Sequence, residues 1–314
     1  MRKKAIIVSI NGRKLTKREK LLLSKENPWG LILFKRNIKS FNQIKILIAN
    51  IKKITKDKNF PILIDEEGAT VSRLKSILNH NISAKYFGNL YLIDKKLSTR
   101  IYKEYLNSLC KILKKIGINI NTIPVLDVLR NNTSKIIGNR SFSIKKDIVK
   151  KLGKITVNQL HKNKIIAVVK HIPGHGCSKF DSHHKMPKVN LSLKRLNSID
   201  FYPFKINTAK LAMTAHILYQ KIDRTNVATF SKKIIKEIIR KKIGFNGILM
   251  SDDISMKALQ FDLINNAKKS LEAGCNLVLY CAGKIDDNFK LIKSVPYIDS
   301  FTAKKTSEIY KILR

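Results

Sequence analysis

Eight short apolar runs, separated by longer segments with helical spacing, are the feature that most restricts how this chain can fold. Most runs are apolar at consecutive positions, as in parallel strands that are covered on both faces. They occupy residues 5–10, 30–34, 61–65, 117–121, 165–171, 211–216, 247–252 and 276–281. Strands that alternate with helices predict βα units around a parallel sheet, and eight units fit a closed (β/α)8 barrel of the TIM type, an α/β fold.

The segments between these runs carry apolar residues at three- and four-residue intervals, as amphipathic helices do. Residues 41–51 and 101–113 are examples, with apolar side chains expected at Ile46 and Ile101 among others. No linker rich in proline, glycine or serine divides the chain. We therefore expect residues 1–314 to form a single barrel domain.

The charge of the chain is strongly positive, with 63 Lys and Arg against 22 Asp and Glu, a formal net charge of +41. Such a charge attracts polyanions. The lysines are scattered along the whole chain together with many Ile and Asn, as A/T-rich codon usage would produce, so we predict no specific nucleic-acid partner. No apolar stretch approaches the roughly 20 residues of a membrane span, and we predict no span either.

The four cysteines are Cys110, Cys177, Cys275 and Cys281. Their spacing matches no metal motif, and they are too sparse for a disulfide framework. The basic N-terminus precedes an apolar run that is too short for a secretory signal, and no cleavage site follows. These features favour a cytoplasmic protein.

Polar residues that are costly to bury gather where the predicted strands end. Asp65, Lys170, His171, His216 and the pair Asp252–Asp253 all occupy such positions. Two connections, 124–142 and 173–187, are longer than a plain βα loop requires, and both follow strand ends. Because barrel enzymes place their chemistry at the carboxyl ends of the strands, this edge is the predicted site.

Each of these residues also has a structural explanation when it is taken alone. Asp252 or Asp253 could cap the following helix, and His171 and His216 could be hydrogen-bonded core histidines. Lys170 could be a rim lysine. Gly174 and Gly176 could form an ordinary turn.

The longer strings are more specific than their single residues. KHIPGHGCSKFDSHHKMP, at 170–187, closely resembles the signature of the glycoside hydrolase family 3 β-N-acetylhexosaminidases, the bacterial peptidoglycan-recycling glucosaminidases. Further matching strings in the same order cover essentially the whole chain. They include LIDEEGATVSRL at 63–74, IPVLDV at 123–128, IGNRSF at 137–142, MTAHILY at 213–219 and GFNGILMSDDISMKA at 244–258.

The resemblance implies a role for each matching position. Asp252 matches the nucleophile, His183 the general acid/base and Asp181 the aspartate that orients this histidine. The positions that match residues holding N-acetylglucosamine in the −1 subsite are Asp65, Arg73, Arg140, Lys170 and His171. The implied enzyme is a retaining, exo-acting β-N-acetylglucosaminidase that acts on GlcNAc-anhydro-muropeptides in cell-wall recycling. We expect it to be a monomer that needs no cofactor and no metal.

These residue types suit the reaction. A retaining hydrolase needs a carboxylate that attacks the anomeric carbon and a group that protonates the leaving oxygen. A histidine that titrates near neutrality can give and take back that proton. The chain departs from the family at Glu66, Ala69 and Thr70, where Gln, Gly and Arg are common, and at Asn276, where Asp is usual.

The sequence leaves four other functions open. The same residues could serve an N-acetylglucosaminide phosphorylase, because a neutral histidine would not repel phosphate. A metal-dependent barrel hydrolase could use His171, His175, His183 and Asp252 as ligands. Lys170 could form a Schiff base in an aldolase. The positive charge could also belong to a nucleic-acid or wall-polymer binding protein with a degenerate site.

Overall fold

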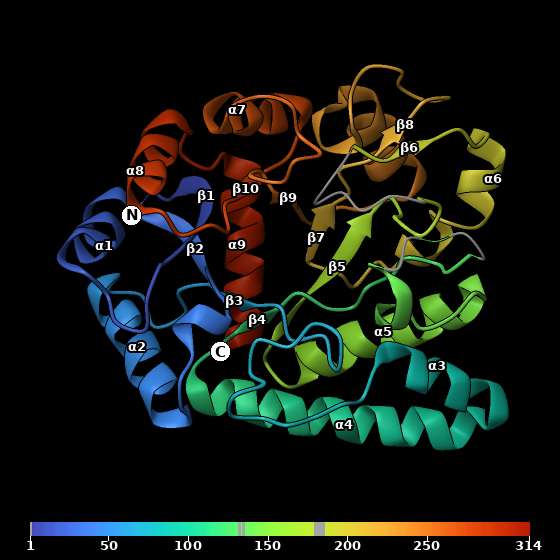
Figure 1. Ribbon diagram of the computed structural model, residues 1–314, viewed down its shortest axis with the longest axis horizontal. Helices are drawn as coiled ribbons and strands as arrows, with labels where there is room; N and C mark the ends of the chain where they lie inside the picture. The colour runs from blue at the N-terminus through green and yellow to red at the C-terminus, as the bar shows by residue number, and fades with distance from the viewer. Residues whose placement is uncertain (1, 131–132, 134–135, 179–185) are drawn as a thin grey trace.

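The computed structural model describes residues 2–130, 133, 136–178 and 186–314. Eight parallel strands form a closed barrel in which β1 pairs with both β2 and β10 (Figure 1). The barrel strands are β1 (Lys4–Ser9), β2 (Pro28–Leu33), β3 (Ile62–Ile64), β4 (Ile120–Asn121), β5 (Ile166–Ile172), β7 (Leu211–Thr214), β9 (Ile248–Asp253) and β10 (Leu277–Leu279). This confirms the predicted fold class, and each of the eight apolar runs overlaps one barrel strand.

The strands are shorter than the apolar runs in several places. β3 and β4 contain only three and two residues, and β7 ends at Thr214, two residues before His216. Where the barrel closes, Ile6 of β1 lies opposite Val278 of β10, and on its other side Val8 of β1 lies opposite Leu31 of β2. Apolar side chains beyond a strand end are still buried by the covering helices, so hydrophobicity alone overstates strand length.

A second, two-stranded sheet was not predicted. β6 (Lys188–Val189) pairs in parallel with β8 (Leu218–Tyr219), and these strands follow β5 and β7 in the chain. Two residues are too few to show either alternation or an apolar run.

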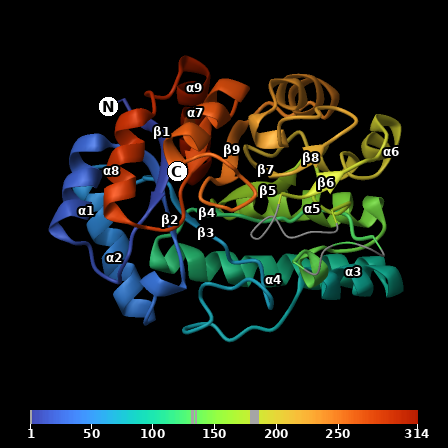
Figure 2. The same cartoon turned by 45° about the horizontal axis from the view of Figure 1, so that its top comes forward.

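Helices surround the barrel. They are α1 (Lys17–Leu21), α2 (Phe41–Ile54), α3 (Ala84–Ile93), α4 (Lys95–Ile116), α5 (Lys146–Lys162), α6 (Leu193–Ser198), α7 (Leu263–Ala273), α8 (Ile285–Ser294) and α9 (Ser300–Leu313), with π-helical segments η1 (Leu22–Glu26) and η6 (Ile234–Lys242). Figure 2 shows α3 and α4 following one another along one flank. Among the described residues, no helix is both long and apolar enough to cross a membrane.

The helices predicted from apolar spacing are present, although their faces differ in detail. In α2, the side chains of Ile44, Leu47 and Ile51 are buried, and Ser40 caps the helix by accepting a hydrogen bond from the backbone N–H of Gln43. Ile46 and Ile101 were expected on apolar faces but are exposed. Gly117 ends α4 with φ of 94°, a conformation that favours glycine.

The hydrophobic core has two layers. Alternate strand residues, such as Ile7, Leu63 and Val168, fill the interior of the barrel, and the remaining strand residues pack against the helices. Ile309 of α9 joins the interior layer, and Trp29 near the start of β2 donates a hydrogen bond from Nε1 to Thr306 Oγ1 of the same helix. Helix α9 therefore covers the amino-terminal end of the barrel and leaves the carboxyl end for a site.

Candidate active site

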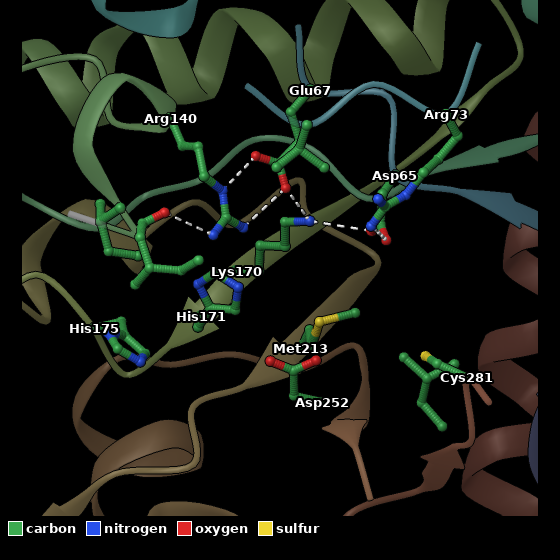
Figure 3. A pocket seen from close by; sticks show the side chains of 14 residues that line it. Asp65, Glu67, Arg73, Arg140, Lys170, His171, His175, Met213, Asp252 and Cys281 are labelled. Atoms are coloured by element: carbon green, nitrogen blue, oxygen red, sulfur yellow. Dashed lines mark hydrogen bonds and ion pairs between the residues drawn. The ribbon is translucent and has the colours of Figure 1, made fainter. Parts of the chain in front are cut away.

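A cavity of about 260 Å³ opens among the carboxyl ends of the barrel strands (Figure 3). This volume is near the lower end of the range for small-molecule sites, about 300 to 1,000 Å³, and suits a compact polar ligand. Its polar wall consists of Asp65, Glu67, Arg73, Arg140, Lys170, His171, His175 and Asp252. Apolar surface is contributed by Val71, Ile136, Ile137, Met213 and Leu279, with Cys281 beside them.

Lys170 lies at the centre of an ion-pair network on one side of this cavity. Its Nζ is 3.2 Å from Asp65 Oδ1 and 2.5 Å from Glu67 Oε1, and it donates a hydrogen bond to Thr122 Oγ1. Arg73 Nη2 donates to Asp65 Oδ2 at 2.9 Å, and Arg140 binds both carboxylate oxygens of Glu67, at 2.7 and 3.0 Å. The network presents ordered cations and carboxylates to a ligand that has many hydroxyl groups.

The network keeps its carboxylates ionised. Burial alone would raise the pKa of Asp65, but Lys170 and Arg73 outweigh it and lower that pKa far below its ordinary value. Burial likewise opposes ionisation of Glu67, and Arg140 and Lys170 lower its pKa to about 2. The pKa of Arg140 is raised, because the attraction of Glu67 exceeds the effect of burial. Near neutral pH the wall therefore carries fixed opposite charges.

Glu66 supports the loop that carries Arg73. Its buried carboxylate accepts hydrogen bonds from the backbone N–H groups of Arg73 and Leu74, at 2.8 and 2.9 Å, and contacts His80 Nε2 at 2.8 Å. Glu66, which the resemblance marks as a departure, thus acts beneath the cavity wall. Asn276, the other departure, bonds to Arg240, Leu249 and Thr302 and does not line the cavity.

Asp252 lies on the cavity wall near the end of β9, across from Lys170 (Figure 3). Its Oδ1 accepts a hydrogen bond from the backbone N–H of Asp253 at 2.8 Å. Burial opposes ionisation, but His171, His216 and that N–H outweigh it and hold the pKa of Asp252 below its ordinary value. An ionised, accessible carboxylate is the state that a nucleophile requires.

His216 holds the backbone beside Asp252. Its Nδ1 is 2.7 Å from Thr229 Oγ1, and its Nε2 is 3.1 Å from the carbonyl oxygen of Asp253. Burial is the largest cause of the lowered pKa of this histidine. A neutral ring can donate from Nε2 to the carbonyl and accept from the threonine hydroxyl, which satisfies both of its nitrogens.

The structure brings six of the eight predicted site residues together around one cavity: Asp65, Arg73, Arg140, Lys170, His171 and Asp252. Asp181 and His183 lie outside the described residues. The sequence reasoning missed Glu67, which follows Asp65 by two positions, and Asp127, which lies within the quoted string IPVLDV. Glu67 follows the predicted strand 61–65 by two residues, and Asp127 lies in the long connection 124–142, so these positions were the available signals.

The structure contradicts two of the structural explanations that were considered for single residues. Asp252 and Asp253 do not cap the next helix, because Asp262 is the N-cap of α7. Lys170 is 2% exposed and is not a rim lysine. Its Nζ contacts Asp65, Glu67 and Thr122, so it is not free to attack a carbonyl carbon as a Schiff-base lysine must. Within the described part of the chain, no three His, Cys, Asp or Glu residues are placed to hold a metal ion.

The low pKa of Glu67 predicts that acid weakens the fold. A folded-state pKa of about 2, against an ordinary 4.5, gives stabilisation that is complete above the ordinary value and is lost as the pH falls toward 2. Glu67→Gln should lower the free energy of unfolding on the order of 3 kcal/mol near pH 7 and flatten its decline toward pH 3. Urea titrations across this range measure both effects.

The matched control for this prediction is Glu237→Gln. Glu237 forms an exposed pair with Lys241, so this variant should follow the pH dependence of the wild type. A Glu67→Gln protein as stable as the wild type at pH 7, with an equally steep decline in acid, would contradict the assigned ion pairs.

The sequence of this chain is similar to one known family and to several of its named relatives. Residues 2–304 match the family described as the glycosyl hydrolase family 3 N terminal domain. A beta-hexosaminidase of Neisseria gonorrhoeae is 32% identical over 282 residues, which span 88% of this chain and 77% of that protein. A beta-hexosaminidase of Haemophilus influenzae is 31% identical over 314 residues, 96% of this chain and 88% of the relative.

Solved structures show the same similarity in three dimensions. Native NagZ from Neisseria gonorrhoeae matches with a TM-score of 0.90 at 30% identity, over 98% of this chain and 90% of that one. The same protein in complex with N-trifluoroacetyl-D-glucosamine matches with a TM-score of 0.89 at 30% identity and the same coverage.

Proposed function

This chain belongs to glycosyl hydrolase family 3, and on that premise we propose that it is a retaining, exo-acting β-N-acetylglucosaminidase. Its relatives make it a glycoside hydrolase of the β-hexosaminidase type. In our proposal Asp252 attacks the anomeric carbon and forms the glycosyl-enzyme. His183 protonates the leaving oxygen and then activates water, and Asp181 orients His183.

The observation that carries the proposal is the position of Asp252. An ionised carboxylate lies on the wall of a small cavity whose opposite wall is a network of cations and carboxylates. Such groups can bind the hydroxyls of one sugar residue and leave its anomeric carbon facing Asp252. Asp65, Arg73, Arg140, Lys170 and His171 are the residues to which we assign this binding.

We propose N-acetylglucosamine as the sugar, because a relative with 30% identity binds an N-acylated glucosamine. Peptidoglycan fragments of the GlcNAc-anhydro-muropeptide kind, met in the cytoplasm during cell-wall recycling, are the proposed natural substrates. Residues 1–314 would act as one catalytic domain and as a monomer. No metal or cofactor takes part in the proposed steps.

The direct test is hydrolysis of a chromogenic N-acetyl-β-glucosaminide, with the corresponding β-glucoside as control. We expect clear preference for the N-acetylated substrate, and NMR of the first product should show the β anomer. Equal rates on the two glycosides would contradict the proposed sugar. An initial α anomer would contradict the double displacement.

Phosphorolysis with the same residues is the second candidate, because a neutral histidine leaves phosphate free to approach the glycosyl-enzyme. Product analysis in phosphate buffer decides between the two acceptors. We expect free N-acetylglucosamine, whereas a sugar 1-phosphate would identify a phosphorylase. We also expect undiminished activity in the presence of a chelator. A loss of activity there would favour a metal-dependent hydrolase.

His183→Ala should separate substrates by their leaving groups. An activated aryl glycoside needs little protonation and should lose less than about 10-fold in turnover, whereas a natural disaccharide should lose about 100-fold or more. Parallel assays of wild type and variant on both substrates measure the difference. Equal losses on both would argue against a general-acid role.

A further inference from the structure

We propose that Asp127 is a positioning residue that fixes the tautomer of His171 and so makes His171 Nε2 the acceptor for one hydroxyl of the bound sugar. The inference deepens the proposed function and rests on it for the identity of the ligand. It concerns a carboxylate to which neither the sequence motifs nor the comparisons gave a role.

Asp127 lies on the segment after β4, which is tied to β5 by backbone hydrogen bonds. Leu126 N donates to Lys170 O at 2.7 Å, and Lys170 N donates to Pro124 O at 3.1 Å. The Asp127 side chain is fully buried. Its Oδ2 is 2.7 Å from His171 Nδ1, and its Oδ1 accepts from the backbone N–H groups of His175 and His171, at 2.6 and 3.3 Å.

These contacts determine where the proton of the His171 ring lies. Burial would raise the pKa of Asp127, but His171 and His175 outweigh it, and the group remains a carboxylate. A carboxylate only accepts hydrogen bonds, so Nδ1 of His171 must carry the proton. In the neutral ring Nε2 then has a free lone pair.

That lone pair is available to a ligand. His171 lines the cavity, and within the described residues no hydrogen bond occupies its Nε2. Two other carboxylates of the cavity, Asp65 and Glu67, are already bound by cations, and Asp252 is the proposed nucleophile, while Lys170, Arg73 and Arg140 can only donate. A sugar hydroxyl both donates and accepts, so it can accept from one of these cations and donate to Nε2.

The competing explanation is that Asp127 only anchors the chain at His175. Asp127→Asn separates the two, because the amide oxygen can still accept from the backbone N–H groups. The amide NH2, in contrast, would donate to Nδ1 of His171 and move the ring proton to Nε2. The same exchange at a triad aspartate inverts the histidine tautomer and lowers kcat about 10⁴-fold.

The first measurement is NMR of protein labelled with ¹⁵N-histidine, at about pH 8, well above the ordinary histidine pKa of about 6.5. His171→Asn identifies the signals of this residue by their absence. We expect a protonated Nδ1 and a bare Nε2 in the wild type, and the reverse in Asp127→Asn. An unchanged tautomer in the variant, or protons on both nitrogens in the wild type, would overturn the proposal.

Asp200→Asn is the matched control. Asp200 is a second fully buried carboxylate, paired with Arg130 and making no hydrogen bond to His171. Its replacement removes a buried negative charge as Asp127→Asn does, and it should leave the His171 tautomer as in the wild type. If the His171 tautomer also changed in Asp200→Asn, the change would be a general response to the loss of a buried charge. That result would overturn the specific role of Asp127.

The second measurement compares kcat/KM on a chromogenic N-acetyl-β-glucosaminide and its monodeoxy analogues. Asp127→Asn should lower kcat/KM about 100-fold on the parent, but only a few-fold on the analogue that lacks the hydroxyl bound to Nε2. Equal losses on the parent and every analogue would reduce Asp127 to an anchor and overturn the proposal. A wild type inactive on all of them would refute the proposed function instead, and the NMR result would still stand.

Discussion

Asp252→Ala is expected to abolish hydrolysis of natural and activated glycosides alike, lowering turnover by at least about 10⁴-fold. A good leaving group does not compensate for a missing nucleophile, because the glycosyl-enzyme cannot form. This behaviour contrasts with that of His183→Ala, which spares activated substrates. Steady-state rates on an aryl glycoside and on a disaccharide measure both patterns in parallel.

The space left by the Asp252 side chain offers a sharper version of this test. A small anion such as azide can enter it and attack the anomeric carbon of an activated substrate from the face that the carboxylate used. The product should be the α-glycosyl azide, formed with a single inversion. A β-glycosyl azide would instead place the missing group on the side of the acid/base and would contradict the assignment.

Asp253→Asn is the control within the same pair of carboxylates. Asp253 accepts hydrogen bonds from the backbone N–H groups of Ser255 and Cys281 and from the Ser255 hydroxyl, so its side chain holds a turn. Its replacement should cost less than about 10-fold in turnover. Loss as large as that of Asp252→Ala would mean that the two carboxylates act together or that their roles are reversed.

The positions of the eight barrel strands were predictable because each strand is buried on both faces and helical segments separate the strands. The same logic placed Asp65, Lys170, His171 and Asp252 at one edge, since parallel strands bring their carboxyl ends together. Family resemblance added Arg73 and Arg140. Arg73 lies in a loop and Arg140 ends a three-residue 3-10 helix, and segments of this kind have no periodic pattern that marks a residue.

The contacts among these residues were not predictable from the pattern. Glu67 bridges Lys170 and Arg140, and Asp127 bonds to His171, because particular loop conformations bring these groups within hydrogen-bonding distance. These pairs join positions that are 103, 73 and 44 residues apart. The β6–β8 pair was not predicted for a different reason, because tertiary contacts alone specify strands of two residues.

Lys170→Met should produce the largest loss among the sugar-binding positions. It removes a buried cation that contacts both Asp65 and Glu67, and the two carboxylate oxygens that face it keep only Thr122 and Arg140 as partners among the described residues. We expect kcat/KM to fall about 1,000-fold and the free energy of unfolding to fall by about 3 kcal/mol. Kinetics and urea unfolding on the same preparation measure the two effects.

The control for charge removal is Lys210→Met. Lys210 pairs with Glu308 at 3.1 Å, but these side chains are 32% and 29% exposed, so its loss should cost less than about 1 kcal/mol and leave kcat/KM unchanged. Near-normal kcat/KM in Lys170→Met would contradict a sugar-binding role for the buried lysine.

A double variant distinguishes binding of sugar from support of the fold. Because Lys170 and Asp65 interact directly, Lys170→Met with Asp65→Asn should lose less stability than the two single losses added together, by about 1 kcal/mol or more. Its activity should not recover, since removal of the second group cannot restore contacts of the first with the sugar. If the stability losses simply add, the pair is not coupled. If activity returns when the charges are balanced, these residues govern the charge of the cavity and do not bind the sugar.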